Sequence, residues 1–131
     1  MKFKIGDQRK FSVTISDKII RDFAELSGDK NPIHLDDAFA ATTRFEKRIA
    51  HGILTGAFIS RVLATDLPGP GAIYLGQTLR FTAPVFVDEE IEIQVTVKEI
   101  NEAKKILTID TTARKSSGEI VVKGEATVLV P

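Results

Sequence analysis

The sequence contains no cysteine and only two histidines. The absence of cysteine excludes a disulfide framework, a thiolate nucleophile and a zinc site with cysteine ligands. Two histidines by themselves make a poor metal site, because a structural or catalytic metal usually needs three or four protein ligands. We therefore expect no metal in this protein.

The chain also lacks an excess of charge of either sign, because 18 basic residues balance 18 acidic ones. Such a balance provides no basic surface for a nucleic acid or for an anionic membrane, so we expect neither as a partner. Residues 1–8 have no apolar core of signal-peptide length, and no run approaches the roughly 20 apolar residues of a membrane span. The expectation is a soluble, cytoplasmic protein.

No internal repeat, low-complexity tract or linker-like segment interrupts the 131 residues. A chain of this length forms one domain that buries roughly two thirds of the surface exposed by its unfolded form. We therefore treat residues 1–131 as a single domain.

The first part of the chain predicts a strand and then a helix. Phe11, Val13 and Ile15 alternate with polar residues, as in a half-buried strand, and Ser16 suits the N-cap of a helix that begins near Asp17. Four apolar residues of this helix recur at helical spacing and predict its buried stripe: Ile19, Ile20, Phe23 and Leu26. A second, short helix is predicted at residues 36–42.

The remainder predicts one enclosed helix and a series of strands. Residues 52–65 are apolar on almost every side of a helical wheel, which is typical of a helix surrounded by other structure. The sequence Pro-Gly-Pro-Gly at residues 68–71 ends this part. Strand patterns separated by turns then cover residues 72–81, 90–100, 105–114 and 119–130. The pattern predicts an α+β protein in which an antiparallel meander encloses one helix.

A carboxylate and an imidazole lie close together where the first helix should end. Gly28 can take the left-handed conformation that stops a helix, and Pro32 pushes the residue before it out of helical geometry. Asp29 and His34 are therefore expected on non-helical backbone, where both could act on one water molecule in general acid–base catalysis. Two ordinary roles stay open: the Asp could bond to turn amides, and the His could be a half-buried structural residue.

Residues 27–34, Ser-Gly-Asp-Lys-Asn-Pro-Ile-His, fill every fixed position of the signature of the MaoC-like (R)-specific enoyl-CoA hydratases. Further matches follow in the order of that family: Asp36, Ala40, Phe45, residues 49–52, Ser60, residues 74–77 and residues 83–85. The chain resembles this family over nearly its whole length. The resemblance implies a single hot-dog fold, with a long antiparallel β-sheet wrapped around a central apolar helix. It also implies a homodimer whose sheets join edge to edge, with the acyl tunnel near the subunit boundary.

The same resemblance implies a lyase that reversibly hydrates trans-2-enoyl-CoA to (R)-3-hydroxyacyl-CoA. Asp29 and His34 would deprotonate the water and return a proton to C2, with their individual roles left open. The backbone N–H of Gly52 would bind the thioester carbonyl, because this residue opens the enclosed helix, where unpaired N–H groups and the positive end of the dipole point outward. The alternative for Gly52 is an ordinary helix start. The coenzyme A thioester is the substrate, and no separate cofactor is expected.

Three further residues are candidates for binding the substrate. Ser60 matches a family serine close to the catalytic pair, although its hydroxyl could equally bond within its own helix. Asn31 is expected to order the loop in preference to contacting the substrate. Leu63 either shapes the acyl pocket or belongs to the core. The basic residues at positions 44–48 could bind nucleotide phosphates, but a solvated loop is the favoured interpretation.

Other functions stay open within the same fold. One is a dehydratase that acts on acyl groups attached to acyl carrier protein, and another is a non-catalytic subunit that binds acyl thioesters. A thioesterase is disfavoured, because its carboxylate is placed differently. We expect no extra domain of the kind that the longer eukaryotic relatives carry, and this expectation favours short to medium acyl chains. Supply of polyhydroxyalkanoate precursors, fatty-acid breakdown and fatty-acid synthesis all remain as pathways.

Overall fold

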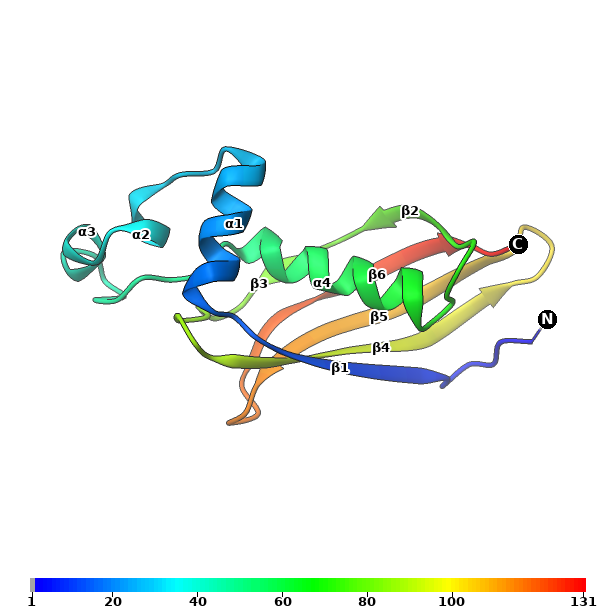
Figure 1. The fold of residues 1–131 in the computed structure, drawn as a ribbon. Coiled ribbons are helices and arrows are strands. Elements are labelled where there is room, and N and C mark those ends of the chain that lie inside the picture. The colour runs from blue at the N-terminus through cyan, green and yellow to red at the C-terminus, as the bar shows by residue number, and fades with distance from the viewer. Residues whose placement is uncertain (1) are drawn as a thin grey trace.

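One long helix, α4, lies along a curved antiparallel sheet, while three shorter helices gather at one end (Figure 1). Residues 2–131 are described in this computed structural model. The helices are α1 (Asp17–Ser27), α2 (Pro32–Leu35), α3 (Asp37–Ala41) and α4 (Gly52–Thr65). The strands are β1 (Gln8–Thr14), β2 (Ile73–Gln77), β3 (Arg80–Phe81), β4 (Glu90–Asn101), β5 (Ile106–Lys115) and β6 (Ile120–Leu129). This arrangement is the hot-dog fold that the family resemblance implies.

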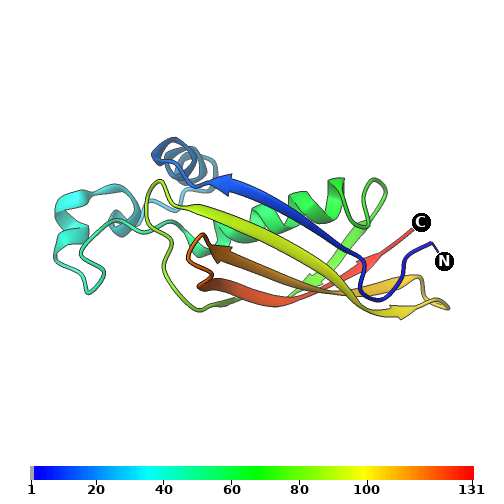
Figure 2. The ribbon, with the colours of Figure 1, turned by 90° about the horizontal axis from the view of Figure 1, so that it is seen from below.

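The sheet has the strand order β1-β4-β5-β6-β2, and β3 also pairs with β6. All its pairings are antiparallel, and the view from below shows the long strands curving past α4 (Figure 2). The predicted burial of one face of β4 is confirmed, because four alternating side chains are at most 1% exposed: Ile91, Ile93, Val95 and Val97. β1 and β2 are the two edges of this sheet.

Helix α4 is buried on one side only within a single chain. Leu54, Ile59, Val62 and Leu63 are at most 5% exposed and belong to the central hydrophobic cluster. On the other side Ile53 is 52% exposed. The prediction of a helix enclosed all round is therefore confirmed for the face on the sheet and wrong, within one chain, for the face beside β2.

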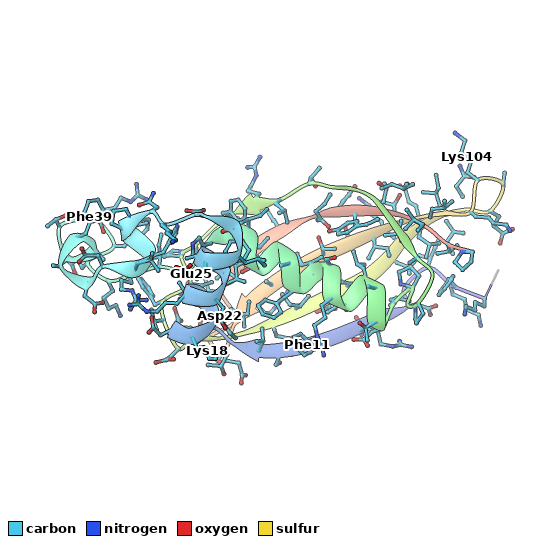
Figure 3. All side chains as sticks on the ribbon, turned by 45° about the horizontal axis from the view of Figure 1, so that its top comes forward. Phe11, Lys18, Asp22, Glu25, Phe39 and Lys104 are labelled. Atoms are coloured by element: carbon cyan, nitrogen blue, oxygen red, sulfur yellow. The ribbon has the colours of Figure 1, made fainter. Side chains whose placement is uncertain are left out.

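Helix α1 has the predicted ends. The hydroxyl of Ser16 accepts a hydrogen bond from the N–H of Ile19, and Gly28 ends the helix in the left-handed region with a φ of 79°. Its charged residues Lys18, Asp22 and Glu25 face solvent (Figure 3). The placement of Leu26 in the buried stripe is wrong, because this side chain is 87% exposed. The buried face is set by Ile20 and Ala24, and a residue two positions after Ala24 points away from it.

The predicted strand at residues 72–81 is interrupted and forms β2 and β3. The interruption lies at Thr78, whose hydroxyl accepts the N–H of Glu125 at 2.9 Å, so that a side chain replaces part of the regular ladder. Gly124 on β6 permits this approach, because a Cβ built there would lie 1.8 Å from the carbonyl oxygen of Thr78. None of the helices within residues 2–131 has both the length and the apolar character needed to cross a bilayer.

Candidate active site

The segment between α1 and α2 is ordered by its own short side chains. The N–H of Asp29 donates to the hydroxyl of Ser27 at 3.1 Å, and the Oδ1 of Asn31 accepts the N–H of Ile33 at 3.1 Å. Asn31 is thus the N-cap of α2, as expected for a residue that orders the loop. Pro32 occupies the first turn of α2, where its missing N–H is not needed.

His34 lies inside α2 and not on an extended loop, so the prediction of non-helical backbone is correct for Asp29 and wrong for His34. Proline restricts the residue that precedes it and favours the helix that follows. Asn31, with φ −55° and ψ 126°, shows the predicted effect, and His34 lies beyond it.

Asp29 and His34 do converge, and a second imidazole joins them. One polar side-chain atom from each of Asp29, His34 and His51 lies within 4.8 Å of the other two. The rings of His34 and His51 are stacked, with centroids 3.8 Å apart and planes inclined by 28°. From the sequence, His51 had no role beyond its place in the family-like block at residues 49–52. The signals that pointed to it were its place in the family-like block at residues 49–52 and the presence of only two histidines in the chain.

The hydrogen bond of His34 determines which ring nitrogen is free. Its Nδ1 lies 2.7 Å from the carbonyl oxygen of Ile49. A carbonyl oxygen can only accept, so Nδ1 carries the proton and Nε2 keeps a lone pair. Partial burial lowers the pKa of His34 and the neighbouring His51 adds to this, while the bond to Ile49 and the charge of Asp29 act in the opposite direction. His34 is therefore a neutral imidazole with an available basic nitrogen at neutral pH.

His51 is almost fully enclosed, at 2% exposure. Its Nε2 donates to the backbone carbonyl oxygen of Asp29 at 2.9 Å, and the ring of Phe23 packs against it edge-on with centroids 4.9 Å apart. Its Nδ1 is buried and has no hydrogen-bond partner within residues 2–131. His51 thus contacts the ring of one member of the pair and the backbone of the other.

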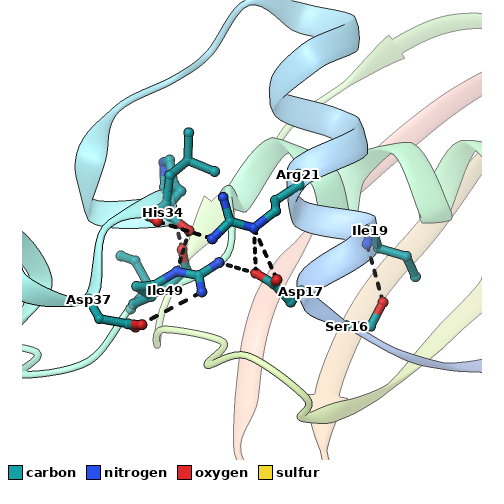
Figure 4. A network of polar contacts seen from close by, with 9 residues as sticks. Ser16, Asp17, Ile19, Arg21, His34, Asp37 and Ile49 are labelled. Carbon is teal, nitrogen blue, oxygen red and sulfur yellow. Dashed lines mark hydrogen bonds and ion pairs between the residues drawn. The ribbon is translucent and has the colours of Figure 1, made fainter.

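A buried arginine, Arg48, fixes the backbone of His34 within the polar network that also joins Asp17 and Arg21 (Figure 4). Arg48 is 7% exposed, and its Nε donates to the carbonyl oxygen of His34 at 2.8 Å. Its terminal nitrogen pairs closely with the carboxylate of Asp17, which also binds Arg21. These two arginines lower the pKa of Asp17, with Arg48 having the larger effect. Both interpretations of Arg48, solvated loop and phosphate contact, are therefore wrong.

The other two basic residues of the connection are exposed. Arg44 lies beside Phe45 and lines the wall of the neighbouring cavity, while Lys47 lies over the ring of Phe86 at 4.5 Å from its centroid. Only Arg44 stands where a polar part of a ligand in that cavity could meet it.

Gly52 is the first residue of α4 and faces a cavity of about 320 Å³. The walls of this cavity include His34, His51, Gly52, Thr55 and Phe81. The side chain of His51 does not cap the helix; the N–H of Leu54 bonds to the carbonyl oxygen of His51, and the N–H of Gly52 is left for a ligand. A Cβ built on Gly52 would lie 2.7 Å from the ring of Phe81, so only glycine fits here without moving that ring.

The three predicted substrate-binding residues lie outside this wall. Within residues 2–131, the lining of the cavity does not include Asn31, Ser60 or Leu63, nor Asp29 itself. The carboxylate of Asp29 lies within 4.8 Å of ring nitrogens of His34 and His51, which do line the cavity. Leu63 is 2% exposed in the core, and Ser60 is half-buried on α4. Contact of Asn31, Ser60 and Leu63 with a substrate stays a prediction.

The convergence of Asp29, His34 and His51 is also close enough for a metal ion. However, backbone carbonyls occupy Nδ1 of His34 and Nε2 of His51, which leaves one free nitrogen on each of two stacked rings. Stacked rings direct their nitrogens outward along their own planes and not toward a shared point between the rings. This arrangement suits proton transfer at His34 better than shared coordination, and the expectation of no metal stays a prediction.

The hot-dog fold, a basic nitrogen beside a carboxylate, and a free helix amino terminus on one cavity together define an acid–base site for a substrate with a carbonyl group. The chain belongs to the MaoC-like domain family, whose sequence profile matches residues 2–119.

Individual relatives agree with this family. An (R)-specific enoyl-CoA hydratase of Rhodospirillum rubrum is 48% identical over 98% of this chain and 88% of its own length. The crystal structure of an (R)-hydratase of Aeromonas caviae, described as involved in PHA biosynthesis, superimposes with a TM-score of 0.96. It is 43% identical, over 99% of this chain and 98% of its own. A mitochondrial 3-hydroxyacyl-[acyl-carrier-protein] dehydratase of Arabidopsis thaliana is 35% identical over 98% of this chain and 78% of its own length.

Proposed function

We propose that this protein is an (R)-specific enoyl-CoA hydratase, a hydro-lyase that adds water to a trans-2-enoyl-CoA. The observation that carries the proposal is the free Nε2 of a neutral His34 beside the Asp29 carboxylate, at a cavity that also contains the amino terminus of α4. Hydration needs a base for water, an acid for C2 and a donor for the thioester oxygen, and these groups can supply all three.

The reaction uses these groups as follows. Asp29 and Nε2 of His34 hold a water molecule, which loses a proton to the pair as its oxygen bonds to C3 of the substrate. The electrons of the C2=C3 double bond move toward the thioester oxygen, and the N–H of Gly52 stabilises the enolate. The proton held by the pair then passes to C2 on the same face, which gives a syn addition. An oxyanion donor of this kind contributes about 3 kcal/mol to transition-state stabilisation.

The test is the loss of the enoyl absorbance of crotonyl-CoA with purified protein. Asp29→Asn and His34→Ala should each slow turnover by roughly 10² to 10⁴ with the fold intact. Asp22→Asn, which removes an exposed carboxylate from α1, is the matched control and should keep the wild-type rate. Wild-type turnover in either site variant would refute the proposed chemistry, and a product of (S) configuration would refute the stereochemical assignment.

A second candidate substrate is the same acyl group on acyl carrier protein, which is favoured by the similarity to the plant mitochondrial dehydratase. The site groups act on the acyl chain and the thioester, so they do not separate the two carriers. Comparing crotonyl-CoA with crotonyl-acyl carrier protein at equal concentration decides between them. We expect the coenzyme A thioester to be the better substrate, with short to medium chains preferred.

We also propose that the protein is a homodimer formed along the edge strand β2. Four apolar side chains on β2 and the outer face of α4 are between 38% and 54% exposed: Ile53, Ile73, Tyr74 and Leu75. Three of them, Ile53, Tyr74 and Leu75, border a surface hollow of about 440 Å³. A second copy that pairs β2 with β2 would continue the sheet and cover these side chains.

Light scattering coupled to gel filtration tests this dimer. We expect twice the mass of the chain for the wild type and a shift toward the monomer for Leu75→Lys. Phe39→Lys, at a 44% exposed residue of α3, is the control and should leave the dimer intact. A wild-type monomer at micromolar concentration would contradict the proposal. Cytoplasmic location, tested by cell fractionation, and the choice among the three pathways stay predictions from the sequence.

A further inference from the structure

One buried side chain, His51, contacts each part of the proposed site and takes no part in the proposed proton transfer. Its ring is stacked on the ring of His34 at 3.8 Å, and its Nε2 donates to the backbone carbonyl of Asp29 at 2.9 Å. It also immediately precedes Gly52, the proposed oxyanion donor. A single imidazole therefore joins the base, the carboxylate-bearing loop and the first residue of α4.

The burial of His51 is not explained by packing alone. Its Nδ1 is buried without a partner, and an unsatisfied buried polar atom costs roughly 1–3 kcal/mol. A phenylalanine would also stack on His34 and fill the same space without that cost. What a phenylalanine would lack is the N–H that binds the carbonyl of Asp29, so the two contacts of His51 need both an aromatic plane and a donor.

We propose that His51 is a positioning residue that fixes Asp29 and His34 relative to one another. The proposal rests on the hydratase function proposed above. The hydrogen bond from Nε2 fixes the backbone of Asp29, and the stack fixes the plane of the His34 ring, so that the carboxylate and the free Nε2 of His34 point at one water molecule. A displacement of about 1 Å in such a pair can lower the rate by up to about 10².

Two substitutions separate the two contacts of His51. His51→Phe retains an aromatic ring for the stack and loses the donor. His51→Gln retains an N–H near the position of Nε2 and loses the stack. His51→Ala removes both. Since His51 is buried, each variant is compared with Val62→Ala, which removes volume from a fully buried site on the same helix and lies outside the cavity wall.

The expected kinetic result is a selective fall in kcat. His51→Ala should lower kcat for crotonyl-CoA by about 10² and change KM by less than about threefold, because positioning affects the transition state more than binding. His51→Phe and His51→Gln should each recover part of the lost kcat. Val62→Ala should be destabilised but keep the wild-type kcat. Equal kcat in all three His51 variants, or kcat within twofold of the wild type in His51→Ala, would overturn the proposal.

A second measurement does not depend on turnover. Each His51 variant contains His34 as its only histidine, so its imidazole ¹⁵N signals need no assignment. In the wild type and in His51→Phe we expect one protonated nitrogen, Nδ1, and one unprotonated nitrogen, Nε2. In His51→Gln and His51→Ala the bond to Ile49 holds the ring without the stack, so we expect the difference between the two signals to shrink as the ring leaves that bond part of the time. Unchanged signals in His51→Ala would overturn the proposal about His51, whatever the activity of the wild type. A wild type that did not hydrate crotonyl-CoA would instead refute the proposed function.

Discussion

Two arginines, one buried and one exposed, bind the same carboxylate, and this difference allows a prediction about stability. Arg48 and Arg21 both pair with Asp17, but the side chain of Arg48 is 7% exposed and that of Arg21 is 51% exposed. Arg48 also donates to the carbonyl oxygen of His34 at 2.8 Å. The perturbation is Arg48→Met, which keeps most of the apolar stem and removes the donors, and Arg21→Met is the matched control.

The expected loss can be estimated from these contacts. A hydrogen bond from a charged donor contributes about 1.5–3 kcal/mol. The ion pair adds at most about 1 kcal/mol, since Asp17 is 47% exposed and solvent screens the interaction. Removal of the arginine also removes the cost of burying its charge, so we expect a net loss of about 2 kcal/mol. For a domain of this size that lowers Tm by about 6–10 °C, whereas Arg21→Met should lower the free energy of unfolding by less than about 0.5 kcal/mol.

The pH dependence tests the electrostatic part separately. The pKa of Asp17 is lowered from 3.8 in the fold, chiefly by the hydrogen bond from Arg48. The unfolded chain therefore binds a proton more readily, and the stabilisation is complete above pH 3.8 and is lost as pH falls through the lowered folded pKa. The difference in Tm between wild type and Arg48→Met should accordingly narrow below about pH 4. Part of the difference in Tm should remain at low pH, because the hydrogen bond from Arg48 to the uncharged carbonyl of His34 does not depend on the protonation of Asp17.

Thermal unfolding by circular dichroism at several pH values provides the measurement. Equal Tm values for Arg48→Met and Arg21→Met would refute the claim that burial makes Arg48 the stronger support. A difference that stays constant down to pH 2.5 would refute the part assigned to Asp17.

Two further predictions concern the site. The acid limb of kcat/KM should have an apparent pKa below 6.5, because burial lowers the pKa of His34 and keeps its imidazole neutral down to a lower pH. The fold likewise loses stability as pH falls from 6.5 through the lowered pKa. An acid limb with an apparent pKa above 6.5 would contradict this prediction. Gly52→Ala should lower kcat/KM by about tenfold or more with little change in Tm, because its Cβ at 2.7 Å must displace the exposed ring of Phe81. Adding Phe81→Leu should restore part of that rate; no recovery would show that the ring is not the cause.

The fold was predictable where periodicity and caps act locally. The alternation in β4 and the bounds of α4 follow from side chains that each meet the same core. The break between β2 and β3 was not predictable, because it depends on Thr78 meeting Glu125 on β6, which lies 47 residues away. The same holds for the exposed face of α4, since periodicity shows that residues are apolar but not whether the same chain buries them.

The site was also predictable only where local sequence patterns determine it. A helix stop and a turn indicated that Asp29 and His34 lie near one another, and the resemblance added Gly52. Arg48 was misjudged, because its partner Asp17 is 31 residues away and a basic cluster on a connection is usually solvated. His51 was missed as a contact of the pair because the stacking of two rings from separate segments produces no characteristic spacing in the sequence.

These supports of the pair come from one short stretch, residues 48–51. Its contacts with residues 29–34 are consecutive: Arg48 to the carbonyl of His34, Ile49 to Nδ1 of His34 and to the carbonyl of Ile33, and His51 to the carbonyl of Asp29. The stretch is itself tied to the chain beyond α4, because the N–H of Ala50 donates to the carbonyl of Val85 at 2.7 Å. It ends at Gly52. The carboxylate, the base and the oxyanion donor therefore keep their mutual positions through one segment, and a change that shifts residues 48–51 should affect all three together.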